Sequence, residues 1–281
     1  ISADSIQIYK SMDIASAKPT KNEMQGIHHH LIDFLDIDKT FSVAEYVPLA
    51  KSAINEIHSK NKLPILCGGT GLYIDSLLNN ISFETSNSDH ILREKLKKQI
   101  QEKGVQSLID ELQKFDPESA KKIHPNNVIK IIRAIEIYKT TGITMTDQIK
   151  RSRLTPSFYD TLFIGLDYKD RNLLYDRINK RVDLMLENGL LEEAQGVLNK
   201  NHNLTAINAI GYKELKPYLN GTCSLNECID KLKQQSRRYA KRQLTWFRKN
   251  KNINWLYIDN YKNFDQLIEE SIKYLTVFRG S

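Results

Sequence analysis

At Leu63-Pro64-Ile65-Leu66-Cys67-Gly68-Gly69-Thr70-Gly71, a short apolar run leads into a glycine-rich turn. The apolar run has the length of a buried β-strand, and leucines at helical spacing follow the turn over residues 72–78. A helix is expected before it at 42–60, because Ser42 and Glu45 match a capping box. Helix, strand, glycine turn and helix in this order are typical of a parallel α/β sheet.

Between residues 84 and 160 the apolar pattern is helical throughout. Apolar residues recur at helical spacing over 91–100, 105–115 and 128–138, and Gly142 is expected to end the last of these helices. Strand character returns at 161–167. It is followed by two helical patterns and a final strand, at 173–188, 231–250 and 255–258. We therefore expect an α/β core made of residues 1–83 and 161–281, interrupted by an all-helical insertion at 84–160.

Composition excludes several classes of protein. Of the 281 residues 40% are hydrophobic and 27% charged, which is typical of a globular chain rather than a disordered one. No apolar run approaches the ~20 residues of a membrane helix, and we see no signal peptide. Cys67, Cys223 and Cys228 form no CxxC pair, which argues against a disulfide framework or a zinc site and fits a reducing cytoplasm. The run His28-His29-His30 is interpreted as structural, because three adjacent histidines cannot all face one ion.

Positive charge is concentrated near the C-terminus. The formal net charge is +7, and no acidic residue occurs from Lys231 to Ile258. Aromatic residues interrupt the cations at Tyr239, Trp246 and Phe247. Cations can meet phosphates and aromatic rings can stack on unpaired bases, so this pattern favours a nucleic-acid partner. The alternative is a helix that turns its aromatic residues to the core and its charges to water, and both can hold at once.

Two short segments are candidates for chemistry. Asp4 follows an expected strand end, and ligands of open α/β sheets bind at the carboxyl ends of strands. The alternative is an aspartate that only caps a turn. The turn Gly68-Gly69-Thr70-Gly71 can bring backbone amides to an anion at a helix N-terminus, or its glycines can serve close packing alone. No GxxxxGK[ST] phosphate-binding loop occurs in the chain.

Motifs along nearly the whole chain resemble those of tRNA dimethylallyltransferases (tRNA isopentenyltransferases). They occur in that family's order and are Ile1-Ser2-Ala3-Asp4-Ser5-x-Gln7-x-Tyr9, Asp13-Ile14-x-x-Ala17-Lys18-Pro19, Gly68-Gly69-Thr70-Gly71-Leu72-Tyr73, His124-Pro125-Asn126, Gly211-Tyr212 and Ala240-Lys241-Arg242-Gln243-x-Thr245-Trp246-x-Arg248. The resemblance implies a P-loop-NTPase-like parallel sheet core with a helical insertion that grips the anticodon stem-loop of tRNA.

The resemblance also implies roles for individual residues. Asp4 would be the general base and Thr70 would help to hold the reactants in line. Lys18 and Arg181 would bind diphosphate. The segment Val128 to Ile132 also corresponds to a tRNA-contacting segment, although it is more apolar than the family pattern. The residues expected to contact tRNA are Asp4, Ser5, Ile6, Gln7, Thr70, Arg93, Gly211, Tyr212, Lys213, Arg242, Gln243, Trp246 and Arg248.

The chain departs from the family pattern at its start. The family has a GPTASGKT-like loop upstream of the Asp-Ser motif, whereas three residues precede Asp4 here. We therefore expect the native protein to have an upstream strand and P-loop that are missing from this sequence. Mg²⁺ is expected as a cofactor, held through the diphosphate and that loop. The residues present suggest no metal site of their own.

The function implied is transfer of a dimethylallyl group from dimethylallyl diphosphate to N6 of the adenosine 3′ of the anticodon (adenosine-37) in tRNA, with release of diphosphate. We expect a monomer. The alternatives are a P-loop-type nucleotide kinase, an adenylate prenyltransferase and a non-catalytic RNA-binding fragment. The basic aromatic segment and the helical insertion argue against the first two. The third is favoured only if the native protein truly lacks the loop.

Overall fold

The computed structural model describes residues 1–81, 89–152, 158–200 and 204–280, and it divides into two compact units. The core unit comprises Ile1–Ile74 and Asp160–Ser281, and the helical unit comprises Asp75–Tyr159. Residues 84–159 of the expected insertion lie in the helical unit, which begins earlier, inside helix α2 (Gly71–Leu78). No helix among the described residues is long and apolar enough to cross a membrane.

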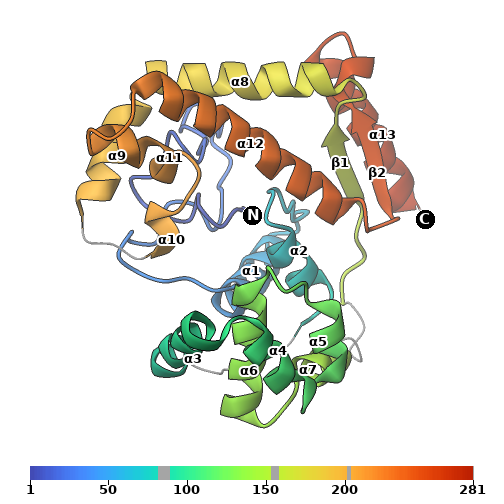
Figure 1. Cartoon of the computed structure of the whole chain (residues 1–281). Helices are drawn as coiled ribbons and strands as arrows, with labels where there is room; N and C mark the ends of the chain where they lie inside the picture. Colours follow the sequence, from blue (N-terminus) through green and yellow to red (C-terminus); the bar gives the residue numbers. More distant parts are fainter. Residues whose placement is uncertain (82–88, 153–157, 201–203, 281) are drawn as a thin grey trace. The chain divides into compact units, whose positions relative to one another are not determined.

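The core unit pairs a small parallel sheet with helices (Figure 1). Strands β1 (Phe163–Asp167) and β2 (Ile253–Tyr257) are parallel and in register along their whole length. Helix α1 begins at the capping box predicted from Ser42 and Glu45. Helix α1 spans Val43–Ser59. The other elements are α8 (Arg171–Glu187), α9 (Leu190–Asn199), α10 (Leu204–Ile207), α11 (Tyr212–Leu219), α12 (Leu225–Phe247), a 3₁₀ turn (Ile258–Asn260) and α13 (Phe264–Gly280).

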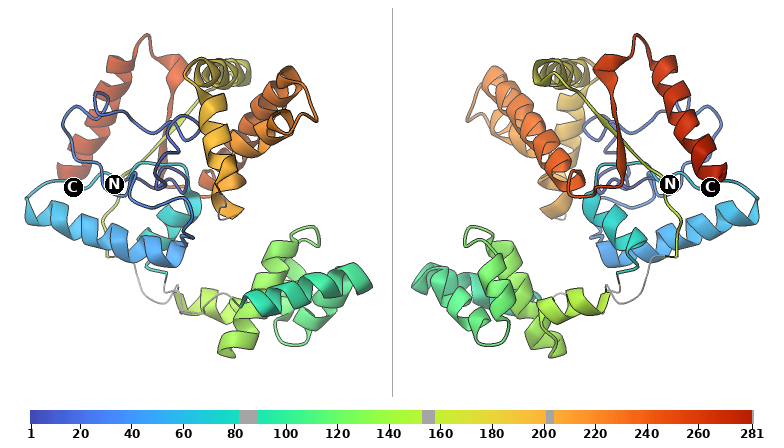
Figure 2. Two further views of the ribbon diagram at one scale, coloured as in Figure 1. Left: turned by 90° about the vertical axis from the view of Figure 1, so that its left-hand side faces the viewer. Right: turned by 90° about the vertical axis from the view of Figure 1, so that its right-hand side faces the viewer.

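The strands and helices predicted around β1, α8, α12 and β2 are confirmed, while α9, α10, α11 and α13 were not predicted. Figure 1 shows that α9 and α13 lie on opposite sides of the core unit, and in Figure 2 α13 and α12 lie on either side of β2. The strand predicted at 63–67 is wrong as a regular element, because its pairing is limited to one parallel bridge between Ser2 and Cys67. Within the described residues the regular sheet therefore has two strands.

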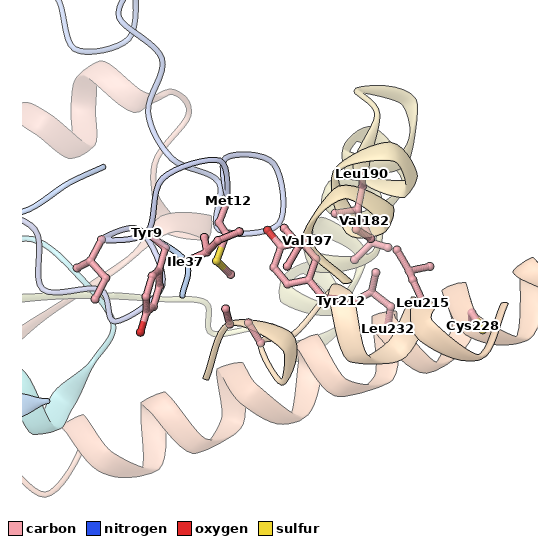
Figure 3. Close-up of a cluster of buried hydrophobic side chains, with 14 residues drawn as sticks. Tyr9, Met12, Ile37, Val182, Leu190, Val197, Tyr212, Leu215, Cys228 and Leu232 are labelled. Atoms are coloured by element: carbon pink, nitrogen blue, oxygen red, sulfur yellow. The ribbon is translucent and has the colours of Figure 1, made fainter. Parts of the chain in front are cut away.

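The hydrophobic core of this unit joins the N-terminal segment to five helices (Figure 3). Tyr9 and Met12 are fully buried, although neither belongs to a helix or a regular strand. They belong to one cluster with side chains from α8, α9, α10, α11 and α12, among them Val182, Leu190, Val197, Ala206, Tyr212, Leu215, Cys228 and Leu232. Burial of apolar side chains thus fixes an N-terminal segment that has almost no regular hydrogen bonding of its own.

Besides the end of α2, the helical unit contains five helices and no strand among its described residues. The helices are α3 (His90–Lys103), α4 (Gln106–Gln113), α5 (Pro117–Lys122), α6 (Val128–Thr141) and α7 (Met145–Ser152). The predictions of α3, α4 and α6 are confirmed, as is the end of α6 at Gly142, whose φ of 72° suits glycine. The short helices α5 and α7 were not predicted. Around Leu108, Leu112 and Ile135 these helices share a core of their own.

A buried glutamate ties α3 to α6. Glu136 is 0% exposed and accepts two hydrogen bonds from Arg93, at 2.8 and 2.9 Å, and one from Arg133 at 2.6 Å. The backbone N–H of Asp89 donates a fourth, at 2.9 Å. Burial alone would raise the pKa of Glu136, but the two arginines more than offset it and lower that pKa below its ordinary value of 4.5. The sequence pattern shows only the apolar face of α6 and gives no sign of this buried charge.

We predict that Glu136→Gln destabilises the helical unit at neutral pH by about 3–5 kcal/mol, because it leaves two arginines without their carboxylate. The pKa of Glu136 is lower in the folded state than in the unfolded state. Its stabilisation is therefore complete above the unfolded pKa and is lost as the pH falls through the folded pKa. Calorimetric unfolding should show a difference between wild type and variant that shrinks below about pH 4.5.

The matched control is Glu118→Gln. Glu118 also meets two cations, Lys122 and Lys150, but its side chain is 48% exposed. Solvent screens such pairs, so this variant should unfold close to the wild-type temperature. Equal losses for the two variants would contradict the importance of burial at Glu136.

Candidate active site

The turn at Asp4 is held by the aspartate itself. One carboxylate oxygen, Oδ1, accepts hydrogen bonds from the backbone N–H of Ile6 at 2.8 Å and of Gln7 at 3.2 Å. The turn-capping interpretation of Asp4 is therefore confirmed. The other oxygen, Oδ2, accepts no hydrogen bond from the described residues, so the geometry also leaves it available for chemistry.

Thr70 connects the glycine turn to this aspartate. Its backbone N–H donates to the carbonyl of Ala3 at 3.0 Å, and its Oγ1 accepts from the N–H of Ser5 at 3.0 Å. The Thr70 hydroxyl also donates to Oγ of Ser5 at 3.3 Å. Asp4 therefore lies between two residues that are both bound to Thr70, and the structure brings these two predicted site residues together.

The glycines of the turn are required by close packing. A Cβ on Gly68 would lie 2.4 Å from the carbonyl carbon and oxygen of Ala3. On Gly69 it would lie 1.9 Å from Nε2 of Gln243, which donates a hydrogen bond to the Gly69 carbonyl at 3.0 Å. On Gly71 it would lie 2.3 Å from the indole of Trp246. The turn is thus packed between the Asp4 segment and α12.

Arg181, on α8, lies within electrostatic range of Asp4. Protein atoms crowd the guanidinium and lower its pKa from the ordinary value, while the carboxylate of Asp4 acts in the opposite direction. The residue remains exposed and makes no hydrogen bond to the described residues. Since arginine stays protonated at physiological pH, Arg181 offers a permanent cation to an anion that enters beside Asp4.

Lys18 is placed differently from Arg181. Its ammonium donates to the carbonyl of Tyr9 at 2.8 Å and to carboxylates of Asp13 and Asp33 at 2.5 and 2.6 Å. An ammonium has three N–H donors, and all three are used here. The diphosphate-binding role of Lys18 stays a prediction, and it requires at least one of these bonds to break.

Glu193 is a structural residue that the sequence pattern did not reveal. From α9 it accepts hydrogen bonds from the backbone N–H groups of Asp13, Ile14 and Ala15 at 2.8, 2.8 and 3.0 Å. Its Oε1 also accepts from the Tyr212 hydroxyl at 2.8 Å. The partners are mostly backbone groups far away in the chain, so no motif or spacing indicates this contact.

Several residues predicted to contact tRNA are engaged in contacts within the protein. Tyr212 is 0% exposed, and burial and Glu193 raise the pKa of its hydroxyl. Its contact with tRNA stays a prediction, and its side chain is not accessible for that contact in the structure described. Gly211 is buried against Ala15, while Lys213 is exposed. The Gln7 side chain donates to the carbonyls of Ser16 and Ala17, both at 3.2 Å.

The predicted contacts of the helical unit are also partly engaged. Arg93 forms the bidentate pair with Glu136 described above, and 36% of its side chain remains exposed. In the segment Val128 to Ile132, Ile131 and Ile132 are buried in the core, whereas Ile129 is 83% exposed. Arg93 and this segment stay predictions as RNA contacts, with fewer side chains available than the sequence suggested.

Helix α12 carries its cations on two different faces. Residues at spacings of three and four line a shallow hollow along one face. This basic stripe consists of Arg238, Lys241, Arg242, Thr245, Trp246 and Lys249. Other cations are bound elsewhere: Lys233 pairs with Asp183 at 2.6 Å and Arg237 donates to Asn179 at 2.6 Å. The basic stripe is therefore the part of the acid-free segment best placed to meet an anionic partner.

Arg248, like Lys233 and Arg237, is bound to another residue of the protein. It donates to Oδ2 of Asp167 at 2.7 Å, and Asp167 is 3% exposed at the end of β1. Removal of Arg248 would leave a buried carboxylate with Arg171 as its remaining ion-pair partner among the described residues. The prediction that Arg248 contacts tRNA stays untested, and its observed role is to join α12 to the sheet.

The histidine run is held by local contacts. The rings of His28 and His30 meet edge to face at 4.3 Å, and His30 Nδ1 lies 4.0 Å from Glu56. Burial, and next His28, lower the pKa of His30 from its ordinary value. Among the described residues, no group of three or more His, Cys, Asp or Glu side chains is arranged to hold a metal ion.

Comparison with known proteins gives one consistent result. Residues 7–250 match the family described as IPP transferase. The tRNA dimethylallyltransferase of Thermoanaerobacter sp. (strain X514) is 49% identical over 279 residues, covering 98% of this chain and 88% of the relative. The full-length tRNA isopentenylpyrophosphate transferase from Bacillus halodurans has a similar structure, with a TM-score of 0.71, 43% identity and coverage of 99% of this chain and 86% of that one. A eukaryotic dimethylallyltransferase acting on tRNA gives a TM-score of 0.76 at 29% identity, covering 95% and 70%.

We predict that the glycines of the turn differ in their tolerance of alanine. Gly68→Ala should destabilise the protein by about 1–3 kcal/mol, because its Cβ meets backbone that cannot move freely. Gly69→Ala should cost about 1 kcal/mol, since the flexible Gln243 can move away at the loss of one hydrogen bond. Denaturant unfolding measures both. Gly196→Ala, in a helix with open space around it, is the control and should stabilise by about 1 kcal/mol.

Proposed function

The chain belongs to the IPP transferase family, and we propose that it transfers a dimethylallyl group from dimethylallyl diphosphate to N6 of the adenosine 3′ of the anticodon in tRNA. Membership of this family makes it a tRNA-modifying transferase, so a kinase and a non-catalytic RNA-binding fragment no longer compete. The observation that carries the site assignment is the group formed by Asp4, Thr70 and Arg181. It offers one carboxylate oxygen that accepts no hydrogen bond from the described part of the chain, a fixed hydroxyl and an exposed cation.

Asp4 is the proposed general base. The exocyclic nitrogen of adenine is a weak nucleophile, because its lone pair is delocalised into the ring. As the bond from N6 to the allylic carbon forms, Oδ2 of Asp4 takes a proton from N6. Oδ1 meanwhile keeps its two backbone hydrogen bonds, which fix the carboxylate in position. The two oxygens thus divide a structural role from a chemical one.

Arg181 is proposed to stabilise the leaving group. The bond between the allylic carbon and the diphosphate oxygen breaks with both electrons going to oxygen, and negative charge develops on the diphosphate. An exposed guanidinium near Asp4 can offset that charge as it develops. Thr70 holds the segment on which Asp4 lies, so its contribution in this scheme is to position the base.

We also propose that a P-loop strand and its loop complete the core. This is supported by apolar side chains on the strand segments that nothing in the described residues covers: Ile65 is 68% exposed, and Ile164 and Leu166 on β1 are 37% and 48% exposed. Mg²⁺ would arrive with the diphosphate and neutralise its charge. The described residues themselves provide no cluster of ligands for it, so no step above depends on the metal.

The basic stripe of α12 is proposed as the docking surface for tRNA. It places four cations along one helix face, next to the turn that carries Thr70. Because these cations lie along one face, several of them can bind neighbouring phosphates of the RNA backbone at the same time. A base in an RNA loop can then leave its stack and enter the site at a cost of a few kcal/mol.

We predict that Asp4→Asn lowers single-turnover transfer by about 10²–10⁴-fold in the full-length protein. An asparagine can still accept the hydrogen bonds at Oδ1, so the variant should unfold near the wild-type temperature and bind tRNA normally. Asp170→Asn is the control, since Asp170 caps α8 without lying in this site. A variant that melts lower but transfers at the wild-type rate would show that Asp4 is only structural.

We predict that Arg238→Ser combined with Lys241→Ser flattens the salt dependence of tRNA binding. Each lost phosphate contact should reduce the log–log slope by about 0.7–0.9. Filter binding across a salt series measures the slope, with Lys273→Ser on α13 as a control, because that lysine pairs with Glu270 away from the stripe. An unchanged slope would exclude the stripe as the docking surface.

A further inference from the structure

The three aromatic side chains near the end of α12 have different surroundings. Trp246 packs its indole against Gly71, and Phe247 is half-buried. Tyr239 is 36% exposed and does not pack against the glycine turn in this way. Trp246, at 38% exposed, and Tyr239 therefore both present ring surface to solvent, and Tyr239 is the one of the two that is not packed against the glycine turn.

Tyr239 is oriented toward the candidate active site by its position on the helix. It lies one turn before Gln243, on the same face, and Gln243 holds the Gly69 carbonyl. Thr70, the next residue, holds the segment that carries Asp4. In agreement with this geometry, burial and then the charge of Asp4 raise the pKa of Tyr239.

A cation covers this ring in the structure. The guanidinium of Arg242 lies 5.6 Å from the centre of the Tyr239 ring. Among the described residues, Arg242 makes no hydrogen bond or ion pair, so the ring is its principal partner. A cation above an exposed ring contributes little, and a phosphate group competes well for a guanidinium.

We propose that Tyr239 is the platform on which the target adenine stacks, and that Arg242 covers this platform until RNA binds. The inference rests on the proposed function and names the residue that positions the base beside Asp4. When tRNA docks, Arg242 moves to a phosphate of the RNA, and the flat face of adenine takes its place on the ring. The planar guanidinium of Arg242 is replaced by the planar adenine, and the Tyr239 ring itself need not move.

Position explains why stacking would matter for the reaction. The N6 group must approach Oδ2 of Asp4 within hydrogen-bonding distance, and a base free to rotate would seldom do so. A ring near Asp4 restricts the plane of the base. Tyr239 is thus a positioning residue: its hydroxyl is not needed, and its ring is.

The test uses full-length protein and an anticodon stem-loop RNA. Tyr239→Leu should lower single-turnover transfer about 5- to 150-fold at saturating RNA, the range expected for loss of one base stack. Tyr239→Phe should stay within about twofold of wild type, because the ring remains. RNA affinity at constant salt should change little in either variant, since phosphate contacts dominate it.

A second readout follows the base without chemistry. The same RNA with 2-aminopurine at the target position cannot react, and its fluorescence falls when the base stacks. The complex with Tyr239→Leu should be brighter than those with wild type and Tyr239→Phe. Tyr257→Leu is the matched control, because Tyr257 also has a cation over its ring, Lys169 at 5.6 Å, but lies at the end of β2.

The results separate this inference from the proposed function. Equal fluorescence and equal transfer for Tyr239→Leu and wild type would overturn the stacking role. So would an equal loss for Tyr239→Phe and Tyr239→Leu, which would assign the effect to the hydroxyl. If wild type itself transfers nothing to the unmodified stem-loop, the proposed function fails, while the fluorescence comparison still tests the stack.

Discussion

The carbonyl of Ala3 accepts a hydrogen bond from Thr70, and Gly68 lies so close to that carbonyl that no side chain fits between them. This backbone contact brings the first residues of the chain to the glycine turn. Asp4 and Ser5 follow directly, so their positions depend on it. The other side of the turn is packed against α12 through Gln243 and Trp246. One short turn therefore fixes the carboxylate of Asp4 and the basic helix α12 relative to each other.

Helix α12 separates two tasks by its faces. Lys233, Arg237 and Arg248 hold the helix to α8 and to the end of β1 through Asp183, Asn179 and Asp167. The basic stripe on another face leaves its cations open to solvent. Charge on this segment is thus partly structural, since a buried partner such as Asp167 requires its arginine. The number of cations alone would overstate the surface available to a nucleic acid.

The N-terminal segment is ordered by few, specific contacts. Tyr9 and Met12 are buried in the core, and Glu193 binds three consecutive backbone N–H groups at residues 13–15. A loop with little regular structure pays a high conformational cost to be fixed. Burial and these hydrogen bonds offset that cost and keep the segment after Asp4 in place. Lys18 takes part in the same way, with its charge directed at Asp13 and Asp33.

The sequence by itself determined the elements whose causes are local. The capping box at Ser42 predicts the start of α1, the helical spacing in α3, α4 and α6 predicts an all-helical segment, and Gly142 ends α6 at a positive φ. Motif order along the chain also indicated the family, and the resemblance assigned Asp4 and Thr70 to one predicted site. Only the tertiary structure decided which charged and aromatic residues are available. Arg93 is hydrogen-bonded to Glu136, the backbone of residues 13–15 to Glu193, and Arg248 to Asp167. Tyr212 is buried, whereas Tyr239 is partly exposed. Those partners lie far apart in the chain, and burial depends on what packs against a residue in space, which spacing along one helix cannot show.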